Sequence, residues 1–339
     1  MASNLYVMSD VQFQALNGWN YEIGNKFLDW FETLEVKPNS YFIQLGDMTE
    51  KDTNPGDVVR QLERFFSICA KKFVKSYILV GNHDMKLYHG KVQISFAFAE
   101  EKDKIEVVRD LSNIEIDGMN ILAMPHVRVR GKTLHEFYNK KTPEEYLSLI
   151  KNGKTKFDLA VGHWQKQGAE GSPEWIRDGV STDNLPVNKF MLGHIHNRPD
   201  TDYLGSVWPL KVSEEFSEFG RVIGLVTKTD KIEYSEIEIP RFCKYDTITY
   251  PEPFVKPLDT LVHVYTVEGC KNIGIAQEFY KDVYIRSTGN NKKEEEETIS
   301  SEEDFLFTDY LDAFNKYCAE KKPKLNRNVL KIITNHLKI

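Results

Sequence analysis

Two histidines one residue apart, His194 and His196, directly follow the apolar run and glycine of "FMLG". In an extended segment, side chains at positions i and i+2 project to the same side, so both imidazoles could reach one metal ion. Imidazole is a common ligand of divalent transition metals. A His-x-His pair also occurs as two ordinary packed histidines, so a metal site needs further ligands elsewhere in the chain.

Four other β-type runs also end in residues that can bind a metal. These ends carry Asp10, Asp47, the Asn82-His83-Asp84 group, and His163. In α/β folds ligands bind at the carboxyl ends of the strands, so we expect all five motifs to converge on one edge. A glycine before most of these residues lets the backbone turn sharply there. Five such coincidences favour a metal centre over scattered structural histidines.

The candidate ligands are carboxylates, a carboxamide and imidazoles, without a thiolate. This set suits Mn²⁺, Mg²⁺, Fe or Zn²⁺. Six or seven ligands are too many for a single ion with open positions. They fit two ions ~3.5 to 4 Å apart that share a carboxylate, an arrangement used for in-line displacement at phosphorus. We expect Asp47 to be the shared ligand.

Short apolar runs alternate with helical segments up to about residue 240. Two amphipathic segments, 21–35 and 57–72, are expected to be helices, the second with Asp57 as its N-cap. This alternation predicts an α/β layered fold. The expected strands are 4–9, 40–46, 76–81, 120–125, 157–162 and 189–193.

The pattern changes after residue 240, which we take as the end of the first domain, 1–240. Residues 241–287 read as a small α+β module, with a strand at 259–267 and a helix and second strand within 273–286. Residues 288–304 are polar and charge-blocked, which predicts a flexible acidic linker. Residues 305–339 contain two short amphipathic stretches separated by Pro323, and we expect them to dock on a partner.

Composition indicates a soluble, intracellular protein. The 339 residues are 41% hydrophobic, and no apolar run is long enough for a signal sequence or a membrane span. The four cysteines form no C-x-x-C pair, so neither a zinc knuckle nor a disulfide framework is indicated. The net charge is −7, but 292–304 alone holds two lysines and seven acidic residues. A local basic surface could therefore still bind a polyanion.

The series D-x-Q, G-D, G-N-H-D, G-H and G-H-x-H, in this order between residues 10 and 196, resembles the calcineurin-like metallophosphoesterase superfamily. Within it the chain is most similar to the SbcD-type nucleases, and with the small module, the linker and the tail the resemblance covers nearly the whole sequence. It implies a layered metallophosphoesterase β-sandwich flanked by helices, with a small α+β capping module and a C-terminal helical tail.

The resemblance also implies a role for each motif residue. Asp10, Gln12 and His196 would hold a first metal, and Asn82, His163 and His194 a second, with Asp47 between them. His83 would face the phosphate as a catalytic residue. Asp84, the other candidate catalytic residue, is expected rather to orient the surrounding loop.

Two positions depart from the family pattern. The first motif usually reads D-x-H, whereas this chain has Gln12, which should weaken the first metal site and favour oxygen-loving ions. Glu50 stands where some relatives carry a histidine near the phosphate, and its role here is open.

The function implied is a DNA nuclease with two Mn²⁺ ions, or Mg²⁺, that cuts double-stranded DNA as an exonuclease and single-stranded DNA as an endonuclease. It would be the catalytic subunit of a nuclease–ATPase complex in recombination and double-strand-break repair. The C-terminal helices would bind a coiled-coil ABC-type ATPase. A homodimer in the cytoplasm, without membrane contact, is expected.

Two other functions remain open. A protein phosphatase of the same superfamily would continue the second motif as G-D-x-x-D-R-G, whereas this chain reads "GDMTEKD" without the arginine. A non-catalytic scaffold is the other alternative, with Gln12 as a first sign of lost metal chemistry. The intact remaining motifs argue against it.

Two further features have both a functional and a structural interpretation. The stretch "HVRVRGK" at 126–132 could hold a DNA backbone, or could be a half-exposed strand with a solvated basic face. Trp164 could stack on a base, or simply pack in the core.

Overall fold

The computed structural model divides the chain into two compact units, residues 1–287 and 288–339. The predicted linker and helical tail lie outside the described residues. The structure describes residues 3–14, 18–50, 56–88, 91–127, 134–169, 179–183, 185–210, 221–252, 257–270, 273–280 and 283–286.

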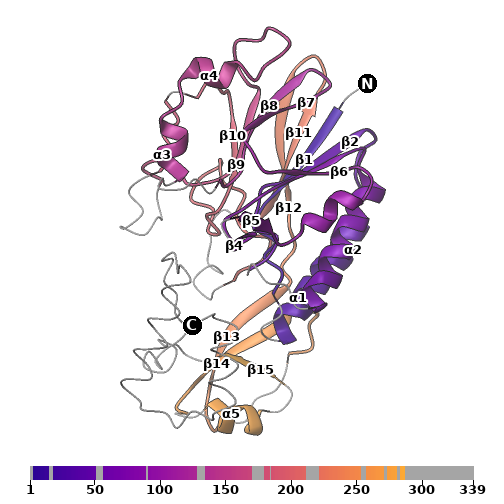
Figure 1. Cartoon of the computed structure of the whole chain (residues 1–339). Helices are drawn as coiled ribbons and strands as arrows, with labels where there is room; N and C mark the ends of the chain where they lie inside the picture. Colours follow the sequence, from indigo (N-terminus) through magenta and orange to yellow (C-terminus); the bar gives the residue numbers. More distant parts are fainter. Residues whose placement is uncertain are drawn as a thin grey trace, which may run out of the picture. The chain divides into compact units, whose positions relative to one another are not determined.

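Two sheets form the centre of the first unit (Figure 1). In the larger sheet β1, β2, β3 and β6 are parallel, and β11 and β12 add an antiparallel margin. Its strands in spatial order are β12 (Ile232–Glu238), β11 (Val222–Lys228), β1 (Ser3–Met8), β2 (Ser40–Gln44), β3 (Ser76–Leu79) and β6 (Ile105–Val108).

In the smaller sheet β10, β9 and β8 are parallel and β7 is antiparallel to β8. A shared apolar core, with Val7 and Ile43 from one sheet and Ile121 and Val161 from the other, joins the two sheets. The strands in spatial order are β10 (Phe190–Gly193), β9 (Leu159–His163), β8 (Met119–Met124) and β7 (Ser112–Ile116).

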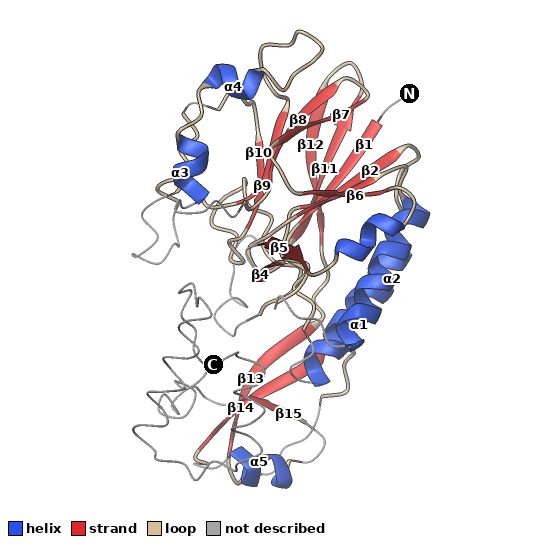
Figure 2. Ribbon diagram, viewed as in Figure 1, coloured by secondary structure: helices blue, strands red, loops and turns tan. Residues whose placement is uncertain are grey.

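Helices cover the outer face of each sheet (Figure 2). On the larger sheet, α1 (Gly18–Thr33) and α2 (Gly56–Lys72) pack through an aromatic core in which Phe31 stacks on Phe65 with ring centroids 5.3 Å apart. On the smaller sheet, α3 (Leu134–Asn139) and α4 (Pro143–Leu147) pack through Tyr138 and Tyr146. The predicted mixed α/β fold is confirmed.

A three-stranded parallel sheet follows residue 240. It consists of β13 (Cys243–Thr249), β14 (Val262–Glu268) and β15 (Tyr284–Arg286), with α5 (Ile273–Phe279) before the last strand. Tyr245 anchors it to the preceding fold, since its hydroxyl donates to the Pro209 carbonyl at 2.9 Å and its ring meets Trp19 edge-on. The predicted strand and helix–strand pair are thus present, and β13 was not predicted.

Several shorter elements were also absent from the sequence prediction. Directly after Asp84 the chain forms a hairpin of β4 (Met85–Tyr88) and β5 (Lys91–Ile94), and a 3₁₀ helix, η1 (Ala97–Glu101), follows this hairpin. Helix α2 begins at Gly56, so the expected N-cap Asp57 lies in its first turn instead, paired with Arg60. Within the described residues, no helix is long and apolar enough to cross a membrane.

Candidate metal centre

The predicted ligands come from both sheets, not from the edge of one. The larger sheet supplies Asp10, Asp47 and Asn82 after β1, β2 and β3, and the smaller sheet supplies His163 from β9 and His194 after β10. The carboxyl ends of these strands therefore meet where the two sheets face each other. All nine predicted site residues lie in this region, linked by the contacts described below.

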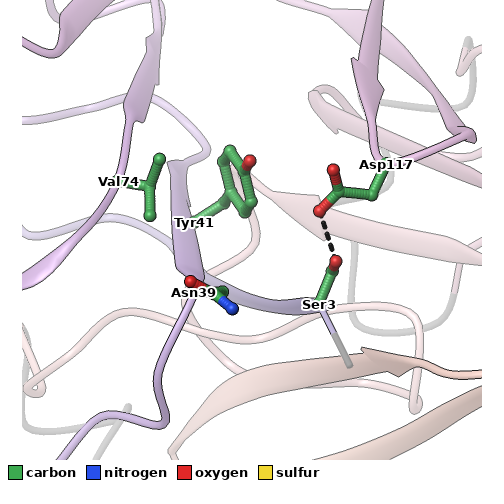
Figure 3. Close-up of a pocket in the computed structure, with 5 residues that line it drawn as sticks. All are labelled: Ser3, Asn39, Tyr41, Val74 and Asp117. Carbon is green, nitrogen blue, oxygen red and sulfur yellow. Dashed lines mark hydrogen bonds between the residues drawn. The ribbon is translucent and has the colours of Figure 1, made fainter. Parts of the chain in front are cut away.

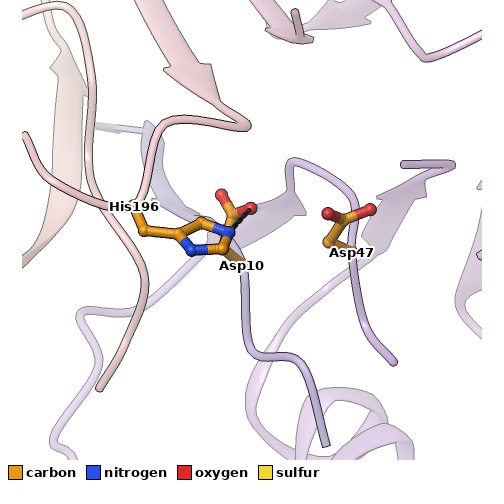
Figure 4. A group of neighbouring side chains, drawn as sticks. All are labelled: Asp10, Asp47 and His196. Atoms are coloured by element: carbon orange, nitrogen blue, oxygen red, sulfur yellow. Dashed lines mark ion pairs between the residues drawn. The ribbon is translucent and has the colours of Figure 1, made fainter. Parts of the chain in front are cut away.

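Asp10, Asp47 and His196 form the centre of the cluster, with one potential ligand atom from each within 4.8 Å of the others (Figure 4). The Nε2 atom of His196 lies 3.6 Å from Asp10 Oδ1. Both carboxylates are almost completely buried, whereas the His196 side chain is 20% exposed. Figure 4 shows the imidazole beside the Asp10 carboxylate, with Asp47 across from them.

Each carboxylate has one oxygen held by the backbone. Asp10 Oδ2 accepts from the His194 N–H at 3.0 Å, and Asp47 Oδ1 accepts from the His83 N–H at 3.0 Å. The other oxygens, Asp10 Oδ1 and Asp47 Oδ2, face the cluster. Asp47 Oδ2 lies 3.2 Å from both His163 Nε2 and Gln12 Nε2, a central position that fits a shared ligand.

The second group of ligands surrounds Asn82. Its Oδ1 lies 2.9 Å from His163 Nε2 and 3.1 Å from His194 Nδ1. His163 Nδ1 is 3.0 Å from the Leu45 carbonyl, which can only accept, so Nδ1 carries a proton donated to that oxygen. This leaves Nε2 to face the cluster, the arrangement in which supporting hydrogen bonds orient metal-binding histidines.

Gln12 lies in the first group. Its Nε2 is 2.9 Å from His196 Nε2 and 3.2 Å from Asp47 Oδ2, and its Oε1 is buried without a hydrogen-bond partner. Asp10 Oδ1 is likewise buried without one. Buried polar atoms are normally paired, and these two oxygens are good ligands for Mn²⁺ or Mg²⁺. The residues present therefore fit divalent ions. Gln12 would contribute its Oε1 atom after a flip of the side-chain amide, because Nε2 is the atom that now contacts Asp47 and His196.

The backbone at the site is unusual in the same places. Asp10, Gln12, Asp47 and His194 have φ values of 43°, 45°, 52° and 81°. Non-glycine residues rarely adopt positive φ, and such conformations concentrate at functional sites where the surroundings hold them. In the described part of the chain, seven non-glycine residues have positive φ, and four of these seven are predicted ligands. This concentration supports a functional site here.

The two acids at the centre of the cluster differ in the direction of their pKa shifts. Burial favours the neutral form of Asp47, but His163 and His83 outweigh it and lower the Asp47 pKa. Burial raises the pKa of Asp10, although His163 and His196 oppose this. The pKa values of the two carboxyl groups therefore shift in opposite directions, and Asp47 is the stronger acid.

The imidazoles differ in the same way. Burial alone would lower the pKa of His163, but the Asp47 and Asp10 carboxylates raise it to about 9. Burial and the charge of His163 lower the pKa of His194 to about 3. The positive charge of a protonated His163 therefore balances the buried carboxylates when no metal ion is bound.

His83 is 39% exposed, and its Nε2 lies 4.0 Å from Asp47 Oδ2. Its Nδ1 is 2.9 Å from the Glu50 carbonyl, an acceptor, so Nδ1 carries a proton and Nε2 is the ring nitrogen on the side of Asp47. Glu50, whose role the sequence left open, therefore positions His83 through its backbone.

Asp84 does not reach the cluster. Its carboxylate is fully buried and accepts from the N–H groups of Met48, Thr49 and Gly81, at 2.9, 3.2 and 2.8 Å. Burial, and then the charge of Asp47, raise its pKa to about 7. Through these hydrogen bonds it ties the loops after β2 and β3 together, and its orienting role in the reaction stays a prediction.

Trp164 and an open pocket lie outside the cluster of predicted ligands. Trp164 is 1% exposed and packs edge-on against Phe190, so the packing interpretation holds. Residues 128–133, most of the basic stretch, lie outside the described residues. An open pocket of about 400 Å³, lined by Ser3, Asn39, Tyr41, Val74 and Asp117, lies at the opposite, amino end of β1 and β2 (Figure 3).

A family model described as calcineurin-like phosphoesterase matches residues 3–198. The chain belongs to this family. The calcineurin-like phosphoesterase is thus a metal-dependent phosphoester hydrolase, and the matched region contains all nine predicted site residues. Among curated proteins, none matches this sequence.

Two solved structures are similar to this phosphoesterase at low identity. One is a protein of unknown function, AQ665, from Aquifex aeolicus, with 19% identity, a TM-score of 0.27, and coverage of 48% of this chain and 81% of that one. The other is the phosphopantetheinyl hydrolase PptH from Mycobacterium tuberculosis, with 15% identity, a TM-score of 0.33, and coverage of 57% and 83%. Similarities this weak carry no argument about substrate.

Proposed function

We propose that this phosphoesterase is a DNA nuclease that hydrolyses phosphodiester bonds with two bound Mn²⁺ ions, or Mg²⁺. The observation that carries the proposal is the two-sided ligand cluster around Asp47, with the partly exposed His83 beside it. Asp10, Gln12 and His196 would hold one ion, Asn82, His163 and His194 the other, and Asp47 both. When bound, the ions would polarise the phosphate and activate a water for in-line attack.

The chain's own residues have two tasks in this reaction. His83 holds a proton on Nδ1 through the Glu50 carbonyl, so its Nε2 is the atom available to a phosphate oxygen. With a second proton on Nε2, His83 can stabilise the charge of the transition state or donate that proton to the leaving oxygen. Asp84 keeps the loops that carry Asp47 and His83 at fixed positions.

Two sequence features support a nuclease over a phosphatase. The second motif reads "GDMTEKD" and lacks the arginine that phosphoprotein phosphatases place there. The five-motif series, followed by a small α+β module, also resembles SbcD-type nucleases. The family match itself is equally consistent with a phosphatase, so substrate choice has to be tested directly.

The wider assembly belongs to the same proposal. The phosphoesterase would act as the catalytic subunit of a complex for recombination and double-strand-break repair. Residues 305–339 would bind a coiled-coil ABC-type ATPase, and a homodimer would work on DNA in the cytoplasm.

A substrate panel separates the two functions. Purified protein should degrade linear double-stranded DNA from its ends and cut circular single-stranded DNA, with Mn²⁺ and not with EDTA. A phosphopeptide should be hydrolysed far more slowly. His83→Ala should lose the DNA activity, and His135→Ala, a histidine of α3 outside the centre, should keep it. Rapid phosphopeptide hydrolysis with intact DNA would favour the phosphatase.

A further inference from the structure

Ser9, the residue before Asp10, has a fully buried side chain at the end of β1. Its hydroxyl donates a hydrogen bond to Asp10 Oδ2. The same oxygen accepts the backbone N–H of His194 at 3.0 Å, so two donors converge on it. Neither donor was recognised in the sequence, where Ser9 reads as the last residue of an apolar strand.

The two donors determine which oxygen of Asp10 faces the cluster. With Oδ2 engaged on both sides, Oδ1 is buried without a hydrogen-bond partner, 3.6 Å from His196 Nε2. Hydrogen bonds to a carboxylate are charge-assisted and restrict its rotation. Asp10 is therefore held ready to offer a single oxygen, although its backbone has the unfavourable φ of 43°.

Gly193, at the end of β10, makes room for this contact. A Cβ atom at this position would lie 2.0 Å from Ser9 Oγ and 2.8 Å from Asp10 Oδ2. Any other residue there would push the hydroxyl from its place. Asp10 follows β1 and His194 follows β10, and these strands belong to different sheets. The hydrogen bond from the His194 N–H to Asp10 Oδ2 therefore also links a ligand of the first group to a ligand of the second.

We propose that Ser9 is a positioning residue that sets Asp10 as a one-oxygen ligand of the first metal, and that Gly193 is glycine to accommodate its hydroxyl. The inference rests on the metal centre and not on the identity of the substrate. Supporting hydrogen bonds around a ligand typically change metal affinity by about 10 to 100-fold. Loss of the Ser9 hydroxyl should thus weaken one site of the pair selectively.

The test is a Mn²⁺ titration of the full-length protein without DNA, followed by electron paramagnetic resonance. For Ser9→Ala we expect the affinity of the first site to fall about tenfold or more, with the second unchanged. At Mn²⁺ concentrations that give wild type a spin-coupled pair, the variant should show a single isolated ion. Ser40→Ala is the matched control, a buried serine at the amino end of β2 whose hydroxyl bonds the Lys37 carbonyl.

A purely structural role for Ser9 predicts a different result. Thermal unfolding without metal would then shift in both serine variants, while two Mn²⁺ ions would bind to Ser9→Ala with wild-type affinity, and this outcome would overturn the proposal. Gly193→Ala keeps the hydroxyl but displaces it, so it should also weaken the first site. A wild type that binds two Mn²⁺ but cuts no DNA would refute the nuclease and leave this inference standing.

Discussion

At the scale of single residues, Asp47 is the charge on which the centre depends. It is 1% exposed, one oxygen is fixed by the His83 N–H, and the other faces His163 and Gln12. The lowered pKa of Asp47 shows that neighbouring imidazoles already compensate its charge. Removing this carboxylate leaves the cationic partners in a buried site without their counter-charge.

Asp47→Ala should therefore abolish nuclease activity and the binding of a Mn²⁺ pair. Calorimetric Mn²⁺ titration and a DNA degradation assay measure the two effects. Asp117→Ala, an exposed acid at the other end of the sheet, should change neither. Retention of two tightly bound ions by Asp47→Ala would show that Asp47 does not join the sites.

His83→Ala should separate binding from turnover. His83 lies 4.0 Å from Asp47 Oδ2 and makes its side-chain hydrogen bond to the Glu50 carbonyl, so metal binding should stay nearly intact. Turnover at saturating Mn²⁺ should fall about 10² to 10⁴-fold, the usual effect of losing a general acid or base. Loss of metal with unchanged saturated turnover would contradict the role given to His83.

Gln12 is expected to set the metal affinity of the first site. Gln12→His supplies an imidazole in place of an amide, so the Mn²⁺ concentration for half-maximal activity should drop about tenfold and Zn²⁺ should bind better. Gln12→Ala should keep partial activity because water can replace an amide oxygen, whereas Asp10→Ala should not. Equal Mn²⁺ midpoints for wild type and both Gln12 variants would show that Gln12 does not touch the metal.

At the scale of elements, strand ends were easier to predict than strand partners. The runs that end at Asp10, Asp47 and His163 were found because each combines an apolar stretch with a polar terminus. Their division between two sheets was not found, because an apolar run carries no information on which strand lies beside it. The contact between Gln12 and His196 depends on that division, so only the structure shows it.

The missed strands have a physical explanation of their own. β12 reads "IEYSEIE" and is mostly exposed at the margin of its sheet, so its apolar signal is weak. β4, β5 and β6 read "MKLY", "KVQI" and "IEVV", and a polar or charged residue interrupts each of these short runs, unlike the continuous apolar runs that marked β3 and β10. Ser9 was missed for a similar reason, since one hydroxyl within an apolar run looks like an ordinary buried residue.

The loop after β3 requires glycine at position 81. A Cβ atom on Gly81 would lie 2.1 Å from Asp47 Oδ1 and 2.2 Å from the Asp47 nitrogen. Gly81→Ala should therefore displace Asp47 and weaken Mn²⁺ binding about tenfold or more. Gly56→Ala is the control, because nothing lies within 4 Å of a Cβ there and alanine favours the start of α2. Mn²⁺ titration and thermal unfolding of both variants check this.

At the scale of the whole molecule, the change in charge along the sequence falls close to the boundary between the two compact units. The acidic block at 292–304 carries most of the net charge of −7, and it begins shortly after the first unit ends at residue 287. An acidic block repels a DNA backbone. Under the proposed function, we therefore expect the first unit to bind DNA and the apolar residues that follow the block to bind the partner.

Truncation after Asn290 tests this assignment. The first unit keeps its strands, helices and every predicted ligand, so the shortened protein should fold, bind two Mn²⁺ ions and retain basal nuclease activity. It should no longer co-purify with the coiled-coil ATPase, because the amphipathic stretches of 305–339 that would dock on it are gone. The measurements are thermal unfolding, Mn²⁺ titration and co-purification of tagged ATPase with both lengths of chain. An internal deletion of 292–304 is the control: it removes the charge but keeps the docking residues, so the complex should survive. A complex that forms equally well with the truncated chain would place the interface on the first unit.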